Sequence, residues 1–326
     1  MLIACEADEA QRSYAVRLVE PHTLPVPARS YNSGAWLRSG TIALSHEDER
    51  TRVMVIDLVG PDGTQKGVVD MGRRPECGYR DFMTLARLPT GELGLADVCA
   101  VFQSPEPESA EFKAVDLDTA VVRSLGGAIE RPYSIAWKED MTAVYATGND
   151  LCVTLYVHAE RETPLNLEVV VDGQRFEAGQ DITATPDHCP SGGRAARPAY
   201  SPDGRTLAFM ASANGATVGQ DLIDVPWTTF VSHDDGPALP VLGGVRYPGD
   251  MVWLSDGSTL VFAGNLGGRQ GLWRVTSAGS ELTLLAKINA LHMALAPDGT
   301  QLVALLAPAA GKTTNDVVIV DLPNAE

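Results

Sequence analysis

The sequence lacks the features that mark membrane-spanning and nucleic-acid-binding proteins. No apolar run approaches the roughly 20 residues that a transmembrane helix needs, so we expect no membrane span. Basic residues are scarce: 25 Lys and Arg stand against 42 Asp and Glu, which gives a formal net charge of −17. Phosphates would be repelled over most of such a surface, so we expect no nucleic-acid partner.

Helical periodicity and compact catalytic motifs are also missing. No window sustains a 3.6-residue apolar repeat, so helices should be scarce. Ser45–Asp48 and Ser232–Asp235 contain residues of the catalytic-triad type, but neighbouring strand residues point to opposite faces, so we interpret both as hairpin loops. The six histidines are scattered, and His292 is the best single metal candidate among them. We predict no catalytic residue, no metal and no cofactor.

A repeated hairpin unit is the strongest positive signal. Ser201–Phe209 reads as two short apolar runs around an Asp-Gly turn, and Leu254–Phe262 and Ala296–Ala304 repeat it. Weaker copies occur at 36–44, 85–95 and 135–145, the last without the glycine. The six hairpins centre near residues 40, 91, 140, 203, 256 and 298, at the turn residues Ser39, Thr90, Asp140, Asp203, Asp256 and Asp298.

This spacing predicts an all-β propeller that occupies residues 1–326 as a single domain. Repeats of roughly 40–50 residues with four strands each are typical of propeller blades, here four-stranded and antiparallel. The last blade, 291–322, has three strands and lacks an outermost one, while residues 2–27 add strands that belong to the first or the closing blade. At about 46 residues per blade, the length favours seven blades over six.

The Ser-Pro-Asp-Gly-Arg-Thr-Leu-Ala-Phe unit at 201–209 resembles the WD-repeat-like motif of TolB-type propellers, which prolyl-oligopeptidase-type enzymes share. The resemblance implies a blade and does not specify an activity. TolB-like proteins add an α/β domain and the peptidases add a hydrolase domain. Neither has a counterpart in this sequence, so no functional residues carry over.

The five cysteines suggest an oxidising compartment. Two local disulfides, Cys77–Cys99 and Cys152–Cys189, would leave Cys5 unpaired. In the alternative interpretation, the cysteines are small buried hydrophobic residues of a cytosolic protein. Cys5 ends a short sequence with the letters of a lipoprotein cleavage box, but no charged or apolar region precedes it. We expect an extracytoplasmic protein, periplasmic or secreted, whose leader is not part of this sequence.

A basic residue precedes each hairpin turn by 9 to 11 positions. These residues are Arg29, Arg80, Arg131, Arg194, Arg246 and Lys287. In a propeller this offset falls between blades, at one mouth of the central channel. The sequence therefore suggests a basic ring that binds an anionic group, such as a peptide carboxylate, an acidic loop or a uronic acid. The alternative is that these side chains pair with aspartates of neighbouring blades.

We favour a non-catalytic propeller that binds a protein or peptide through the channel mouth and through long loops at 171–193 and 213–226. One alternative is a propeller enzyme of the lyase, lactonase or hydrolase type, with a channel-mouth site that could hold a metal. Another is a structural or sensory module of a larger assembly.

Overall fold

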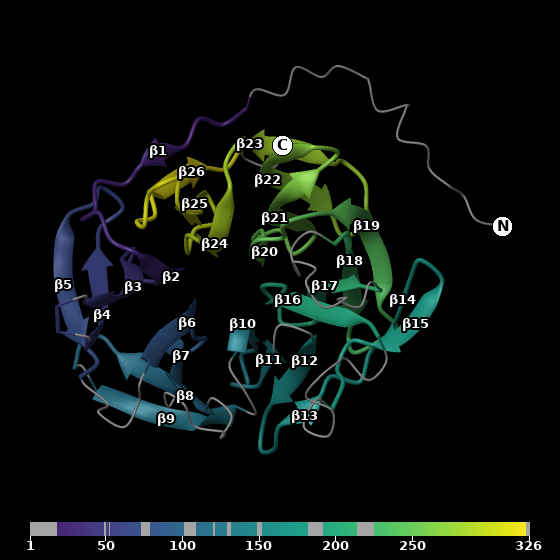
Figure 1. Ribbon diagram of the computed structural model, residues 1–326, viewed down its shortest axis with the longest axis horizontal. Helices are drawn as coiled ribbons and strands as arrows, with labels where there is room; N and C mark the ends of the chain where they lie inside the picture. The colour runs from purple at the N-terminus through teal and green to yellow at the C-terminus, as the bar shows by residue number, and fades with distance from the viewer. Residues whose placement is uncertain are drawn as a thin grey trace.

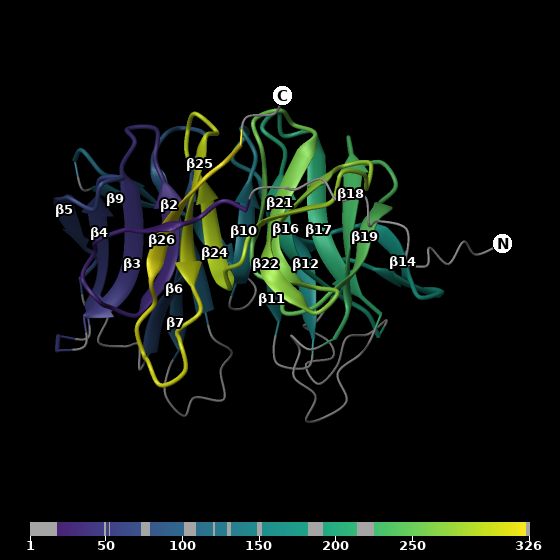
Figure 2. The ribbon, with the colours of Figure 1, turned by 90° about the horizontal axis from the view of Figure 1, so that it is seen from above.

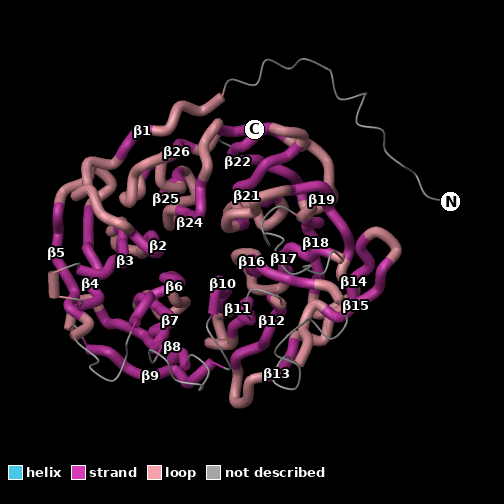
Figure 3. The backbone as a smooth tube through the Cα atoms, viewed as in Figure 1, coloured by secondary structure: helices cyan, strands magenta, loops and turns pink. Residues whose placement is uncertain are grey.

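The protein is described by a computed structural model that covers residues 18–48, 50–51, 53–72, 79–100, 109–119, 121–128, 132–148, 152–181, 192–213 and 225–323. Every regular element in these ranges is a β-strand (Figure 3). The described chain accordingly offers no helix that could cross a membrane.

Six four-stranded antiparallel blades surround a common axis (Figure 1). Their innermost strands are β2 (Tyr31–Trp36), β6 (Tyr79–Arg87), β10 (Pro132–Trp137), β16 (Arg194–Tyr200), β20 (Met251–Trp253) and β24 (Ala290–Leu295). The second strands are β3 (Ile42–Asp48), β7 (Leu93–Ala100), β11 (Ala143–Gly148), β17 (Thr206–Ser212), β21 (Thr259–Leu266) and β25 (Gln301–Leu306).

The third strands are β4 (Val53–Val59), β8 (Ser109–Asp116), β12 (Val153–His158), β18 (Trp227–His233), β22 (Arg269–Thr276) and β26 (Val317–Asp321). The outermost strands of blades one to five are β5 (Gln65–Asp70), β9 (Val121–Ala128), β13 (Thr163–Pro164), β19 (Leu239–Val245) and β23 (Thr283–Ala286). Each blade is thus a meander that runs outward from the axis, as the repeat predicted.

The sixth blade is completed by the other end of the chain. β1 (His22–Thr23) pairs with β26, with His22 opposite Ile319. The sequence analysis assigned residues 2–27 to either the first or the closing blade, and of the described residues His22–Thr23 lie in the closing one. The preference for seven blades is wrong for the described residues, which form six. The N-terminal segment fills the fourth place of an existing blade and adds no further blade there.

The inner hairpins turn as the Asp-Gly pattern predicted. Gly204, Gly257 and Gly299 have φ values of 69°, 65° and 75°, in the left-handed region that glycine tolerates best. In the one turn without glycine, Met141 adopts φ 66°. The carboxylate of Asp140 accepts a hydrogen bond from the backbone N–H of Thr142 at 2.9 Å, which stabilises this turn in glycine's absence.

Apolar seams between the blades hold the disc together. Leu44 of blade one packs with Val303, Leu305 and Ile319 of blade six, and each of these side chains is at most 1% exposed. Close packing leaves little room at Gly34, where a Cβ atom would meet Leu305 Cδ1 at 3.0 Å. Burial of such side chains contributes roughly 1.5–3 kcal/mol each to stability. Because the seam is tightly packed, it also fixes the angle between neighbouring blades.

The long segment after blade three contains a small hairpin of its own. β14 (Glu168–Val171) pairs with β15 (Gln174–Glu177), and Val169 and Phe176 pack into the core shared by blades three and four. Residues 182–191 and 214–224, which make up much of the two long loops, lie outside the described residues.

The Met141 turn generates a stability prediction. We expect Met141→Gly to raise the free energy of unfolding by about 1 kcal/mol, because a left-handed conformation costs a non-glycine residue roughly that amount. Gly204→Ala should lower it by about 1 kcal/mol, since strain and not a clash opposes the new Cβ, whose nearest neighbour is Lys138 Cγ at 4.0 Å. Urea unfolding measures both, and two neutral substitutions would contradict the explanation.

Candidate functional site

A cavity of about 480 Å³ occupies the central channel. It is lined by the innermost strands of all six blades, which surround the axis in Figure 1. Seen edge-on, the strands run across the thickness of the disc (Figure 2). We call the end where the innermost strands begin the start mouth, and the end where the inner hairpins turn the turn mouth.

One position of the repeat is polar in every blade. It lies six residues before each hairpin turn residue and is occupied by Ser33, Thr84, Ser134, Arg197, Asp250 and His292. Five of these six residues lie at or beside a register shift in the pairing of the innermost and second strands. A β-bulge bends the strand and re-aims a side chain, and such bulges are frequent next to functional sites. We call these six residues the polar layer.

Three members of the polar layer form a charged cluster across blades four to six. Arg197 Nη1 donates to Asp250 Oδ1 at 2.9 Å, and Asp250 Oδ2 lies 3.1 Å from Nδ1 of His292. The backbone N–H of Met293 donates to the same Oδ2 at 3.2 Å. Arg197 holds its place with φ 57°, a conformation that is rare for arginine and typical of functional positions.

Opposing effects set the ionisation of Asp250. Burial raises the pKa of this carboxyl, but the nearby His292 and Arg197 outweigh burial and hold the pKa below its usual value. Asp250 is therefore ionised at neutral pH. Both of its oxygens already accept hydrogen bonds, so its role is to orient Arg197 and His292.

On the opposite side of the channel, the polar layer presents hydroxyl groups. Ser33 Oγ accepts a hydrogen bond from the backbone N–H of Leu85 at 2.9 Å, across the seam between blades one and two. Thr84 and Ser134 line the cavity, are 8% and 6% exposed, and have hydroxyl groups with no hydrogen-bond partner in the described structure. Buried polar groups are nearly always paired, so these two hydroxyl groups are exceptions, and their oxygens have almost no solvent-accessible surface.

An aromatic layer lies three residues further along four of the six innermost strands, toward the turn mouth. It consists of the cavity-lining residues Trp36, Trp137, Tyr200 and Trp253. Trp253 Nε1 donates to the carbonyl of Ala199 at 3.0 Å, which fixes its ring. Three residues of extended strand span about 10 Å, so the polar and aromatic layers are distinct levels of one cavity.

The predicted basic ring falls in several different environments. Arg194 is completely buried, and burial lowers the pKa of its guanidinium to about 10, so it does not reach the channel mouth. Arg246 and Lys287 are exposed. Arg131 lies outside the described residues, and for Arg80 only the backbone, in β6, is described. The ring as a binding unit therefore stays a prediction.

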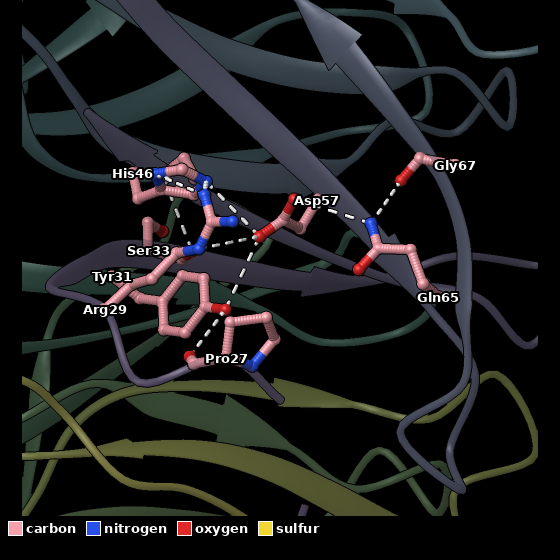
Figure 4. A network of polar contacts seen from close by, with 9 residues as sticks. Pro27, Arg29, Tyr31, Ser33, His46, Asp57, Gln65 and Gly67 are labelled. Carbon is pink, nitrogen blue, oxygen red and sulfur yellow. Dashed lines mark hydrogen bonds and ion pairs between the residues drawn. The ribbon is translucent and has the colours of Figure 1, made fainter. Parts of the chain in front are cut away.

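Arg29 belongs to a polar network inside blade one (Figure 4). Its Nη1 lies 2.7 Å from Nε2 of His46, and its Nε lies 3.8 Å from Asp57 Oδ2. Burial and the charge of Asp57 raise the pKa of Tyr31, whose hydroxyl lies 3.4 Å from Asp57 Oδ2. His46 and Asp57 are 1% and 2% exposed, so we interpret the network as structural.

The two triad-like segments lie mainly on strands. Ser45–Asp48 forms part of β3, so the interpretation as a hairpin loop is wrong there, because His46 pairs with Asp57 of β4 inside the blade. In the second segment, Ser232 and His233 end β18 and Asp234 and Asp235 follow in the turn. His233 is exposed and its Nε2 lies 3.1 Å from Asp234 Oδ2.

The remaining site predictions concern metal and cysteine. In the described part of the chain, no three His, Cys, Asp or Glu side chains are grouped as a metal site. Cys152 is 1% exposed and precedes β12. Cys77 and Cys189 lie outside the described residues, and only the backbone of Cys99 is described, so both predicted disulfides stay predictions.

The charged cluster generates a prediction for stability against pH. The folded-state pKa of Asp250 lies below the unfolded value of about 3.9, so its stabilisation is present above that pH and is lost as pH falls through the folded-state pKa. Asp250→Asn should lower the free energy of unfolding by about 2 kcal/mol at pH 7, and the difference should become smaller as the pH falls below about 3.9. Urea unfolding at pH 7 and pH 3 measures it. Asp172→Asn, on the exposed turn between β14 and β15, is the control and should be neutral at both.

Comparison with known proteins identifies the fold. No family model and no curated protein matches the sequence. Among solved structures, TolB from Acinetobacter baumannii superposes with a TM-score of 0.55 at 11% identity, over 87% of this chain and 64% of that protein. A putative TolB from Agrobacterium tumefaciens gives 0.54 at 15% identity, over 90% and 91% of the two chains. An oligogalacturonate lyase in complex with manganese gives 0.54 at 11% identity, over 95% and 98%.

These likenesses confirm the propeller and extend to TolB-type proteins, as the Ser-Pro-Asp-Gly repeat suggested. They also include a lyase, so they do not select one repeat family or one activity. At such identities the chain shares a fold with these proteins: it is a β-propeller.

Proposed function

We propose that this chain is a non-catalytic, extracytoplasmic propeller that binds a protein or peptide partner and takes an anionic group of that partner into the start mouth of the channel. The observation that carries the proposal is the excess of unpaired donors in one cavity. Asp250 holds Arg197 in place, and both of its carboxylate oxygens already accept hydrogen bonds. The hydroxyls of Thr84 and Ser134 have no partner in the described structure.

A carboxylate fits this arrangement. A guanidinium presents several N–H donors in a planar fork, and the structure gives Arg197 one hydrogen bond, from Nη1 to Asp250. The hydroxyls of Thr84 and Ser134 would donate to the same ligand from the other side of the cavity after a change of side-chain rotamer, because their oxygens are almost inaccessible to solvent. A volume of about 480 Å³ admits a chain end or a single acidic side chain, while the rest of a partner would lie on the surrounding face.

One observation favours an enzyme as the second candidate. Asp250 orients Nδ1 of His292 at 3.1 Å, which leaves the Nε2 atom as a general base at the start mouth. A lyase is among the structural neighbours. Turnover of an oligogalacturonate or another uronate polymer that disappears in His292→Gln would establish this function in place of simple binding.

The binding proposal predicts a preference for free carboxylates. A short peptide such as acetyl-Gly-Gly-Ala should bind at least about 10-fold more tightly with a free C-terminus than as the C-terminal amide, because a charged hydrogen bond contributes roughly that factor. Arg197→Gln should abolish the preference. Isothermal titration calorimetry measures both affinities.

Arg175→Gln is the matched control for this experiment. Arg175 is an exposed arginine of β15, paired with Glu168 at 2.6 Å, and it does not line the channel. The control should retain the preference for the carboxylate. Equal affinity of the two peptides for the unmodified protein would contradict the proposal.

The extracytoplasmic location predicts two disulfides. Protein isolated from its native compartment should yield linked peptides for Cys77–Cys99 and Cys152–Cys189, with Cys5 unlinked, because each pair joins positions that are close in the sequence. Peptide mapping by mass spectrometry, with and without reductant, measures this. If all five cysteines react with an alkylating agent before reduction, the location is wrong.

A further inference from the structure

His158 lies at the junction between blades two and three, which are neighbours in the ring (Figure 1). It is the last residue of β12, in blade three, and is 5% exposed. Its Nε2 atom lies 3.1 Å from the carbonyl oxygen of Leu125, in β9 of blade two. Its Nδ1 atom is hydrogen-bonded to a carboxylate oxygen of Glu162, in the connection between β12 and β13. One imidazole ring therefore joins the two blades, and Glu162 holds the ring from its other side.

Both partners of the ring are hydrogen-bond acceptors. A backbone carbonyl only accepts, so Nε2 of His158 carries a hydrogen. A carboxylate also accepts, so a second hydrogen lies between Nδ1 and Glu162, either on the ring nitrogen or on the carboxyl group. In both arrangements the His158–Glu162 pair has no net charge, and the second proton belongs to the pair and not to one residue. The contacts thus fix the number of protons that the pair holds.

Aromatic side chains surround the His158 ring. Its centroid lies 4.7 Å from that of Phe112, in β8, and 5.8 Å from that of Trp137, in β10. The carboxylate is also largely enclosed, because the side chain of Glu162 is 17% exposed and its Oε2 atom has no hydrogen-bond partner in the described structure. A net charge in such surroundings costs free energy, which opposes loss of the shared proton.

Glu162 is the one charged group that the described contacts join to His158. The other charged side chains on β8, β9 and β10 near the ring have partners of their own. They are Glu111 and Lys113, which pair with each other, with Lys113 also paired to Asp97, then Arg123, which pairs with Glu92, and Lys138, which lies over the Tyr200 ring. In the connection itself, Glu160 and Arg161 are exposed. The apolar cluster around Phe112 adds the titratable residues Tyr145, Tyr156 and Cys152, whose side-chain types ionise above about pH 8.

Blade two is shaped to receive the ring. Gly126 follows Leu125 with φ 121°, a conformation that suits glycine, and a Cβ atom there would lie 3.0 Å from Cε1 of His158. The pairing of β8 with β9 shifts register at this point and leaves Leu125 without an opposite residue in β8. Such a bulge redirects the backbone, and here the Leu125 carbonyl meets blade three.

We propose that His158 and Glu162 form a pH-sensitive link between blades two and three, closed while the pair holds its shared proton and open after that proton leaves. Once the proton has left, the lone pair of Nδ1 faces an ionised carboxylate, and a net negative charge lies among aromatic rings. The link therefore stabilises the junction at neutral pH and is lost as the pH rises.

The link also reaches the channel wall. Trp137, whose ring packs against that of His158, lines the central cavity. Opening of the link would release β9 at the outside of the disc and remove a packing partner of Trp137 at the inside. The device uses none of the residues of the start mouth, so it stands or falls separately from the function proposed above.

Glu162→Gln separates the proton from the hydrogen bonds. The glutamine amide can donate to Nδ1 of a neutral His158 while Nε2 keeps its hydrogen for Leu125, so this variant closes the link without a shared proton. In the unmodified protein, protection of the amides of residues 121–128 from hydrogen exchange should fall by about 10-fold between pH 7 and pH 9, after correction for intrinsic rates. In Glu162→Gln it should stay constant, and in His158→Gln it should be low at both pH values. Hydrogen exchange followed by mass spectrometry measures all three.

Glu160→Gln is the matched control, an exposed glutamate of the same connection, and it should keep the pH dependence of the unmodified protein. Nuclear magnetic resonance of nitrogen-15-labelled histidine, assigned through His158→Gln, should show a protonated Nε2 at pH 7. Constant protection of β9 in the unmodified protein between pH 7 and pH 9 would overturn the proposal. An equal loss of protection in Glu162→Gln, or an Nε2 atom of His158 without a hydrogen at pH 7, would overturn it as well.

Discussion

Closure of the ring is the constraint on which the rest of the structure depends. β1, near the beginning of the described chain, forms the outermost strand of the last blade through its hydrogen bonds to β26. The chain then continues from β1 into β2, the innermost strand of the first blade, so one segment joins the first and last blades. Leu44, Val303 and Leu305 then pack in the seam that closes the circle. With the circle closed, all six innermost strands must face one axis. The same repeat position therefore lines one cavity in four of the blades, through Thr84, Ser134, Arg197 and Asp250.

The closed ring brings residues at one repeated polar position of the sequence into contact with one another. Residues far apart in the sequence, Arg197, Asp250 and His292, belong to three successive blades and meet through one carboxylate. The Asp250 carboxylate is partly buried, so its charge needs partners, and each partner is thereby oriented. The lining that results combines this charged cluster with the hydroxyl groups of Thr84 and Ser134. The chain as a whole carries a net charge of −17, so an arginine in the channel lining contrasts with the excess of acidic residues elsewhere.

Local patterns in the sequence predicted the blades well and the channel less well. The Asp-Gly turns and the meander order agree with the structure because turn chemistry and alternating apolar residues act within one hairpin. The basic ring was aligned at offsets of 9 to 11 from the turns, and a shift of one residue in a strand moves a side chain to the other face. Arg194 accordingly lies in the core. The polar layer has a constant offset of six, and that constancy was the available signal for it.

The sequence by itself determined the repeated antiparallel hairpin, the left-handed turn positions and the acidic surface, since each of these depends on residues near one another in the chain. The tertiary structure decided that six blades close the described ring, that His22–Thr23 complete the last one, and that Arg197 and His292 meet at the carboxylate of Asp250. Those outcomes depend on packing around the whole circle and on bulges that re-aim single side chains. No local pattern of residues specifies either of them.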